Sequence, residues 1–233
     1  MTMIESVCDF VVHPFDKSQG EDGSIRVWFT DLDQQKVEAT QLSWLSTREQ
    51  LRAARLRSPL DRQRYVSSCV LTRRVLSNLT GIVPENLGIV RDKCGKPFLT
   101  LIGDAKHQPS ENSLKFNVSH SEDAFCIATT LRYDVGVDIE VVNPTLDVWA
   151  ISKASLHSED IDRVWSASPK ERSLVFYRLW TKREAFAKML GHGVNSDHLH
   201  HAPSIPWSLR SLEFTLREKQ IVGSVAFAAS TKR

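Results

Sequence analysis

Cysteine is scarce in this sequence, and its placement argues against a structural metal site. Four cysteines occur in 233 residues, Cys8, Cys69, Cys94 and Cys126, too far apart for the paired spacing of zinc ligands. No apolar run approaches the ~18 residues of a membrane-spanning helix, and the first ten residues lack the basic and apolar parts of a secretory signal. We therefore expect reduced thiols in a cytoplasmic protein without membrane contact.

Net charge is also small. Thirty basic and 28 acidic residues leave a formal charge of +2, which does not favour nucleic acid or an anionic membrane as a partner. The arginines are nevertheless clustered, because residues 48–74 contain eight of them and only two acids, Glu49 and Asp61. The N-terminal half is therefore expected to have a basic face. Its arginines are Arg48, Arg52, Arg55, Arg57, Arg62, Arg64, Arg73 and Arg74.

The order of local patterns predicts an α+β protein. Ser46 and Glu49 fit a capping box, which predicts a helix over residues 47–56. A second helix is expected over 61–79 with Gly81 as its stop, and a third over 169–190. Strands are expected at 87–90, 98–101, 114–118, 124–130, 135–141, 212–216 and 221–228.

This order also suggests two similar halves. Each would be a small, mostly antiparallel sheet with one long helix, and the division would fall in the polar loop over residues 103–112. We therefore expect an N-terminal half over residues 1–112 and a C-terminal half over residues 113–233.

Two carboxylates one residue apart are the most informative feature. Asp138 and Glu140 alternate with the apolar Val137 and Ile139, so both acids lie on one face of a predicted strand, with Cα atoms about 6.6 Å apart. Two charges so close repel each other, and Mg²⁺ would relieve the repulsion, since it binds one or two carboxylates together with substrate phosphates. The alternative is an edge strand whose outer face carries two solvated acids.

The predicted helix around residue 180 supplies a third acid. Glu184 and Lys188 are four residues apart and therefore lie on one face of the helix. An exposed ion pair is the simpler interpretation. The bulky neighbours Trp180 and Phe186, however, indicate that much of the helix is covered, and its positive charges, including Arg183, suit a polyphosphate.

Ser119 and His120 come where a predicted strand runs into a turn. Adjacent strand residues point to opposite faces, so the two cannot form a nucleophile–base pair without a sharp bend. A hydroxyl and an imidazole at a strand end are better suited to phosphate oxygens. The later histidines lack cysteine partners and helical spacing, which favours a polar loop over a zinc site; they are His192, His198, His200 and His201.

Together these segments resemble the Sfp-type 4′-phosphopantetheinyl transferases, which prime carrier proteins of fatty acid, polyketide and nonribosomal peptide synthesis. Four blocks match in the order found in that family: Gly95-Lys96-Pro97, Phe116 to Ser121, Gly136 to Glu140, and Trp180 to Lys188. The resemblance implies a pseudo-dimer of two α+β halves with the cofactor in the cleft between them. An internal pseudo-dimer favours a monomer.

The resemblance also implies a role for each matching residue. Mg²⁺ bridging the pyrophosphate of coenzyme A would be held by Asp138, Glu140 and Glu184. The catalytic residues would be Glu184, Lys188 and Asp138, with Lys188 beside the α-phosphate or the departing group and Glu184 as the preferred general base. The coenzyme would be bound by Arg52, Arg64, Lys96, Ser119, His120 and Lys188, with His120 on the 3′-phosphate side.

The implied reaction transfers the 4′-phosphopantetheine arm of coenzyme A to a serine of an apo acyl or peptidyl carrier protein and releases 3′,5′-ADP. Two alternatives stay open: a Mg²⁺-dependent phosphohydrolase of small nucleotides, and an inactive coenzyme A-binding module that docks on a synthase. Two positions depart from the family pattern, because Arg183 and His192 stand where lysine or another basic residue is usual. Arg183 keeps its charge, whereas His192 would weaken a phosphate contact above neutral pH.

Overall fold

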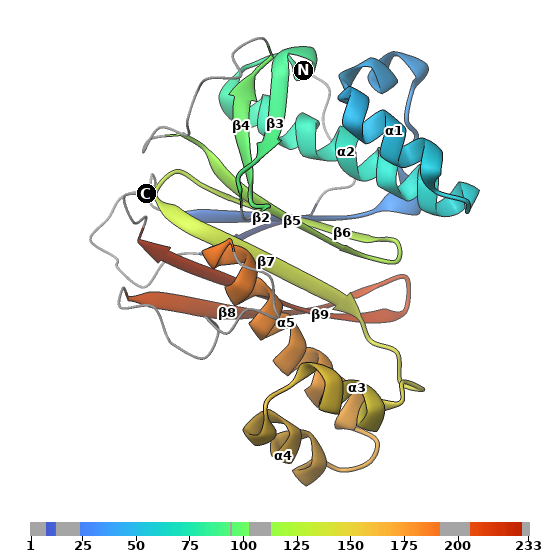
Figure 1. Cartoon of the computed structure of the whole chain (residues 1–233), viewed down its shortest axis with the longest axis vertical. Helices are drawn as coiled ribbons and strands as arrows, with labels where there is room; N and C mark the ends of the chain where they lie inside the picture. Colours follow the sequence, from blue (N-terminus) through green and yellow to red (C-terminus); the bar gives the residue numbers. More distant parts are fainter. Residues whose placement is uncertain (1–7, 13–23, 94, 103–112, 192–205, 230–233) are drawn as a thin grey trace.

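The computed structural model describes residues 8–12, 24–93, 95–102, 113–191 and 206–229, and it confirms the α+β fold. Three antiparallel sheets are present in the described part of the chain (Figure 1). The four-stranded sheet has the order β1-β2-β6-β5, from Cys8–Val12, Ile25–Asp31, Ala124–Thr130 and Lys115–Ser121. The three-stranded sheet has the order β7-β9-β8, from Tyr133–Val141, Lys219–Ala229 and Trp207–Leu216. The strands β3 (Leu87–Arg91) and β4 (Pro97–Leu101) form a separate hairpin.

Three helix ends are set by local chemistry. Ser46 and Glu49 cap each other's backbone N–H groups at the start of α1, and Gly81 and Gly191 end α2 and α5 in the left-handed conformation. The α-helices are α1 (Thr47–Arg55), α2 (Pro59–Thr80), α3 (Val148–Ser155), α4 (Ser158–Ser166) and α5 (Arg172–Leu190). Short 3₁₀ turns are η2 (Leu32–Gln34), η3 (Ala39–Trp44) and η4 (Pro84–Asn86).

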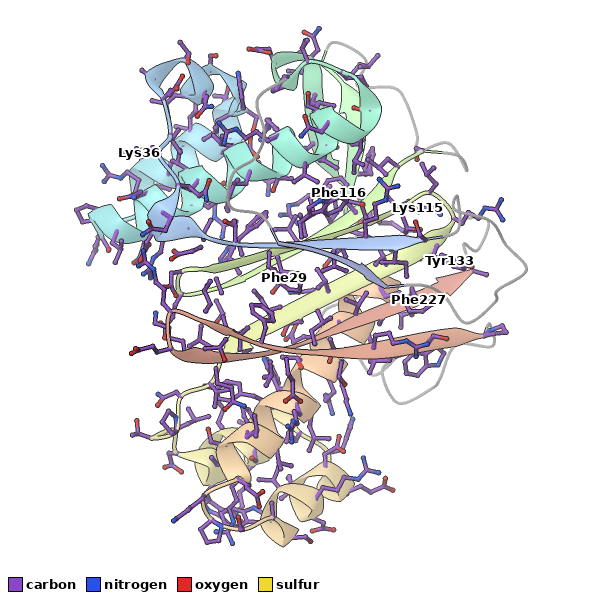
Figure 2. All side chains as sticks on the ribbon, turned by 180° about the vertical axis from the view of Figure 1, so that it is seen from behind. Phe29, Lys36, Lys115, Phe116, Tyr133 and Phe227 are labelled. Atoms are coloured by element: carbon purple, nitrogen blue, oxygen red, sulfur yellow. The ribbon has the colours of Figure 1, made fainter. Side chains whose placement is uncertain are left out.

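The main core lies between the two larger sheets. One face of β2 and β6 packs on one face of β7 and β9, and the rings of Phe29 and Phe214 meet with centroids 4.4 Å apart. Figure 2 shows Phe29 and Phe227 between the layers. On its other face the four-stranded sheet packs its Phe116 and Phe125 against α2, and the three-stranded sheet is covered by α5. Each of these sheets thus has one long helix on its outer face.

Some expected features differ from the structure. Helix α2 begins at Pro59 rather than residue 61, and α5 begins at Arg172 rather than at residue 169. The strands β1 and β2 and the helices α3 and α4 were not expected. The four-stranded sheet takes strands from both sides of residue 112, so a division of the chain into halves there stays a prediction. The expected loop at 103–112 lies outside the described residues. Among the residues that are described, no helix is long and apolar enough to cross a membrane.

Candidate active site

The acids of β7 face α5 because of the two-residue period of the strand. Val135, Val137 and Ile139 fill the core between the sheets, so Asp138 and Glu140 point to the opposite face. The helix passes close to β7, since a Cβ placed on Gly136 would meet the backbone of Ala185. This contact brings the third acid and the lysine of α5, Glu184 and Lys188, to the acids of the strand.

Lys188 is bound directly to the acidic group. Its Nζ donates to Asp138 Oδ1 at 2.7 Å, to Ser119 Oγ at 3.2 Å and to the carbonyl oxygen of Val137 at 3.2 Å. Asp138 is 4% exposed, and its Oδ1 also accepts a hydrogen bond from Ser119 at 2.9 Å. The ion pair is therefore held by further hydrogen bonds, as a buried pair must be to offset its desolvation.

The three carboxylates together carry more negative charge than Lys188 compensates. Burial raises the pKa of Asp138 and of Glu140. Burial, and then repulsion from Asp138, raises the pKa of Glu184 to about 6. Carboxyl groups that share a site in this way resist full ionisation unless a cation joins them.

The donor set of these acids fits a hard divalent cation. Asp138 Oδ2 is buried and has no hydrogen-bond partner, which leaves one carboxylate oxygen unused. Mg²⁺ and Ca²⁺ take such oxygen ligands. The ligand oxygens of Asp138, Glu140 and Glu184 do not all lie within 4.8 Å of one another among the residues described, so a bound cation would have to draw them together.

A different group of three acids is more compact. One carboxylate oxygen from each of Asp31, Asp33 and Asp123 lies within 4.8 Å of the others, where the end of β2 meets the turn between β5 and β6. Each is paired with a cation: Arg217 with Asp31 at 2.6 Å, Arg64 with Asp33 at 2.7 Å, and Lys219 with Asp123 at 2.8 Å. This cluster is therefore an ion-pair network that ties the β8–β9 turn to β2 and α2.

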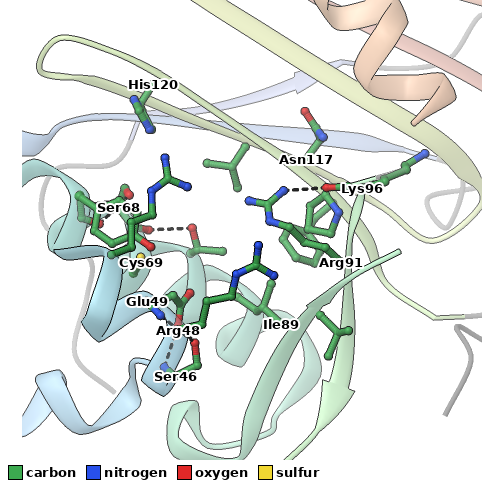
Figure 3. A pocket seen from close by; sticks show the side chains of 18 of the residues that line it. Ser46, Arg48, Glu49, Ser68, Cys69, Ile89, Arg91, Lys96, Asn117 and His120 are labelled. Atoms are coloured by element: carbon green, nitrogen blue, oxygen red, sulfur yellow. Dashed lines mark hydrogen bonds between the residues drawn. The ribbon is translucent and has the colours of Figure 1, made fainter. Parts of the chain in front are cut away.

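A pocket of about 1010 Å³ lies beside the acids (Figure 3). Helix α1 lies at the edge of the pocket and is held there by an ion pair. Its Glu49 binds Arg73 of α2 at 2.7 Å, and the side chain of Arg73 is only 1% exposed. Lys188 belongs both to the pocket wall and to the acidic group. The basic side chains that line the pocket are Arg48, Arg52, Arg55, Arg91, Lys96, His120 and Lys188.

His120 reaches into this pocket from the end of β5. The residue as a whole is exposed, but desolvation of its imidazole lowers its pKa, with the charges of Lys188 and Arg52 as further causes. Arg52 in turn lies over the ring of Tyr65, 5.0 Å from the centroid. The basic wall therefore raises the local positive potential, which favours a polyanion.

Two predicted coenzyme ligands are held elsewhere. Arg64 forms two hydrogen bonds of 2.7 Å with Asp33 and is not among the side chains that line the pocket. Lys96 does line the pocket, but its Nζ donates to the carbonyl oxygen of Met189 at 2.6 Å and to Asp134 at 3.1 Å. Figure 3 shows Lys96 across the pocket from His120. A role for either in coenzyme binding stays a prediction.

The structure adds pocket residues that we did not assign from the sequence. Arg48 and Arg55 lie one helical turn on either side of the predicted Arg52, and Arg91 comes from β3. The cluster of arginines around residue 50 was the available signal, whereas nothing in the sequence marks Arg91. The expected basic position His192 lies outside the described residues, as do His198, His200 and His201.

Two family models match the chain and together cover most of it. The model described as 4′-phosphopantetheinyl transferase, N-terminal, matches residues 33–132. The model described as 4′-phosphopantetheinyl transferase superfamily matches residues 134–230. The two matches meet between β6 and β7, so the first contains α1, α2 and the β5–β6 hairpin, and the second contains all three carboxylates.

Individual relatives agree with the family models. The chain is 29% identical over 171 residues to 4′-phosphopantetheinyl transferase HetI of Nostoc sp. strain PCC 7120, covering 73% of this chain and 70% of that protein. It is 26% identical to a putative 4′-phosphopantetheinyl transferase of Synechocystis sp. strain PCC 6803, over 73% and 66%. It is 26% identical to a 4′-phosphopantetheinyl transferase of Bacillus subtilis, over 58% and 55%. The chain therefore belongs to the 4′-phosphopantetheinyl transferase superfamily.

Proposed function

We propose that this chain transfers the 4′-phosphopantetheine arm from coenzyme A to a serine hydroxyl of an apo carrier protein and releases 3′,5′-ADP. The observation that carries the proposal is the position of Lys188. Its ammonium group is part of the wall of a large basic pocket and is also bound to Asp138 in a group of three carboxylates. A diphosphate lying in that pocket would therefore meet the acids and a cation at the same place.

The basic wall suits the phosphorylated nucleotide end of coenzyme A. Arginine guanidinium groups bind phosphate oxygens in pairs, and three arginines of α1 stand along one side. His120 faces them from β5 and would reach the 3′-phosphate. The surroundings of His120 lower its pKa and so disfavour its protonated form, whereas a phosphate bound beside it would favour that form.

The transfer itself requires positioning, charge neutralisation and removal of one proton. The serine oxygen forms a bond to the phosphorus next to pantetheine, and the bond from that phosphorus to the oxygen of 3′,5′-ADP breaks. Glu184 accepts the serine proton, for which a pKa of about 6 suits it. Lys188 places its charge beside the departing phosphate. Mg²⁺ held by Asp138, Glu140 and Glu184 would supply further positive charge against the pyrophosphate.

The test is a transfer assay with intact-mass detection. The protein is incubated with coenzyme A, MgCl₂ and an apo acyl or peptidyl carrier protein, and the carrier is weighed. A gain equal to the phosphopantetheine arm supports transfer. An unchanged carrier with coenzyme A cleaved would instead indicate a phosphohydrolase, and an unchanged carrier with intact coenzyme A would indicate a binding module. The relatives are named as transferases, so neither alternative is favoured.

Arg52→Gln is expected to weaken coenzyme A binding. Arg52 lines the pocket, and loss of one phosphate-directed charge should raise Kd by about 5–10-fold at low salt, with a smaller effect at high salt. Arg57→Gln is the matched control, because Arg57 is an exposed arginine near the same helix that does not line the pocket. Calorimetric titration with coenzyme A measures both. Equal weakening in the two variants would contradict a local role for Arg52.

The remaining proposals concern organisation. We propose that the chain is an internal pseudo-dimer of two α+β halves and that the coenzyme lies between the halves. The pocket supports this arrangement, because its wall includes α1 and β3 together with Lys188 of α5. A monomeric state and a cytoplasmic location belong to the same proposal, and size-exclusion chromatography with light scattering tests the first of them.

A further inference from the structure

The two larger sheets are joined at their edges by side chains rather than by a backbone ladder. Strand β5 is the edge of the four-stranded sheet, and β7 is the edge of the three-stranded sheet. The backbone N–H groups of three alternate β7 residues donate to side-chain oxygens of three alternate β5 residues. The bonds are Val137 to Asn117 Oδ1 at 3.0 Å, Ile139 to Ser119 Oγ at 3.2 Å, and Val141 to Ser121 Oγ at 3.1 Å.

The match follows from the period of the two strands. Side chains at every second residue of β5 point the same way, as do the N–H groups at every second residue of β7. Unpaired N–H groups on an edge strand would otherwise be a liability or, where buried, a cost in stability. Asn117, Ser119 and Ser121 therefore replace the missing strand partner of β7.

The two serines do more than satisfy the backbone. Each accepts one backbone N–H group, Ser119 also accepts from Lys188 Nζ, and each donates its own hydroxyl proton to the carboxylate of the preceding β7 residue. Ser119 donates to Asp138 Oδ1 at 2.9 Å, and Ser121 donates to Glu140 Oε2 at 2.6 Å. A hydroxyl has a single proton to donate, so its direction is set by this arrangement.

We propose that Ser119 and Ser121 are positioning residues that aim Asp138 and Glu140 at a shared divalent cation. Each serine fixes one oxygen of its acid. The second oxygen of Asp138, Oδ2, is buried and without a hydrogen-bond partner, whereas Glu140 also interacts with the side chain of Trp180. The inference rests on the proposed metal role of these acids. It makes orientation of Asp138, rather than contact with the coenzyme, the main role of Ser119. It also gives a role to Ser121, for which the sequence suggested none.

Asn117 provides a matched control within the same structure. It satisfies Val137 as the serines satisfy Ile139 and Val141, but its side chain has no hydrogen bond to a carboxylate in the described structure. Asn117→Ala should therefore cost folding stability as Ser121→Ala does, since each leaves one N–H group unpaired. Only the serine variant should disturb the acids.

The experiment is Mn²⁺ binding to the free protein, followed by water-proton relaxation and by calorimetry, without coenzyme or carrier. Partners that orient metal ligands typically contribute 10–100-fold to affinity, so Ser121→Ala is expected to raise the Kd for Mn²⁺ about 10-fold or more. Ser121→Thr, which keeps the hydroxyl, should restore most of the affinity, and Asn117→Ala should bind as the wild type does. Both alanine variants should lower the thermal midpoint by roughly 2–8 °C.

Two results would overturn the proposal. One is wild-type affinity in Ser121→Ala, and the other is equal loss in Ser121→Ala and Asn117→Ala, which would indicate a general effect of breaking the strand contact. If Ser121→Ala does not fold, Ser121→Cys takes its place as the variant without a strong hydroxyl donor. This outcome can be told apart from that of the transfer assay. If the wild type modifies a carrier but Ser121→Ala binds Mn²⁺ as tightly as the wild type, the positioning role is refuted and the proposed function is not.

Discussion

Glu184→Gln is expected to reduce phosphopantetheine transfer by about 10³-fold and, above pH 6, to make the folded protein more stable. The loss follows from the removal of the proposed proton acceptor and cation ligand, since a positioned general base contributes about 10²–10⁴-fold. The gain follows from electrostatics. Burial and repulsion from Asp138 raise the pKa of Glu184 to about 6, so its charged form is disfavoured in the folded state.

The raised pKa of Glu184 makes the stability of the folded protein depend on pH. Between pH 4.5 and about 6 the folded protein keeps a proton on Glu184 that the unfolded chain has already lost, so stability decreases as pH rises through this interval. Below it wild type and Glu184→Gln should be equally stable. Above it the variant should be more stable by about 1 kcal/mol, reduced from the full linkage value because the side chain is only half-buried.

Thermal unfolding at pH 4.5 and pH 8 measures the stability difference, and the mass assay measures transfer. Glu213→Gln is the control, because its pKa shift has the opposite sign. Glu213 lies on β8, and the Arg178 guanidinium lowers its pKa. That variant should transfer normally and be no more stable than wild type at pH 8. Near-wild-type transfer by Glu184→Gln would refute the assignment of Glu184, as would a stability gain already present at pH 4.5.

Wild-type activity should follow the same ionisation. Transfer should increase as pH rises through about 6, because Glu184 accepts a proton only when ionised. Bound Mg²⁺ would favour the charged form and move this midpoint to lower pH. The pH profile of turnover at two Mg²⁺ concentrations measures the shift, and a midpoint that does not respond to Mg²⁺ would contradict a shared role of Glu184 in proton transfer and metal binding.

The sequence predicted those parts of the fold that depend on local chemistry. The capping box at Ser46 and the glycine stop at Gly81 mark helix ends correctly, because the groups involved lie within a few residues of each other. The alternating pattern around Asp138 and Glu140 likewise placed both acids on one strand face. The strand β2 was missed, although Ile25, Val27 and Phe29 alternate in the same way.

Long-range pairing was not accessible from local patterns. Arg64 looked available to a phosphate, but it is bound by Asp33, and the ammonium group of Lys96 is taken up by Met189 and Asp134. Both partners are brought near only by tertiary packing. For the same reason the sequence offered Ser119 as a phosphate ligand and did not indicate that β5 and β7 lie edge to edge, which is what directs its hydroxyl proton to Asp138.

Gly136→Ala is expected to be the most damaging single-methyl change at the site. The glycine lies in β7 where α5 crosses it, and an added Cβ would overlap the carbonyl oxygen of Ala185 and the backbone nitrogen of Met189. Both atoms belong to the hydrogen-bonded helix backbone, so neither can move without shifting α5. Overpacking of this kind costs about 3 kcal/mol, or roughly 6–12 °C in the thermal midpoint.

In molecules that still fold, Gly136→Ala should also move the site residues of α5 away from those of β7. A shift of α5 away from β7 moves Glu184 and Lys188 relative to Asp138, so transfer should fall by at least 10²-fold below the unfolding temperature. Gly88→Ala is the control, since its Cβ would approach the side-chain Cγ2 of Thr100 at 2.6 Å, an atom that can rotate. If Gly136→Ala folds with unchanged stability and activity, the close approach of α5 to β7 does not set the geometry of the acids. If it folds poorly but turns over normally per folded molecule, the contact supports the fold alone.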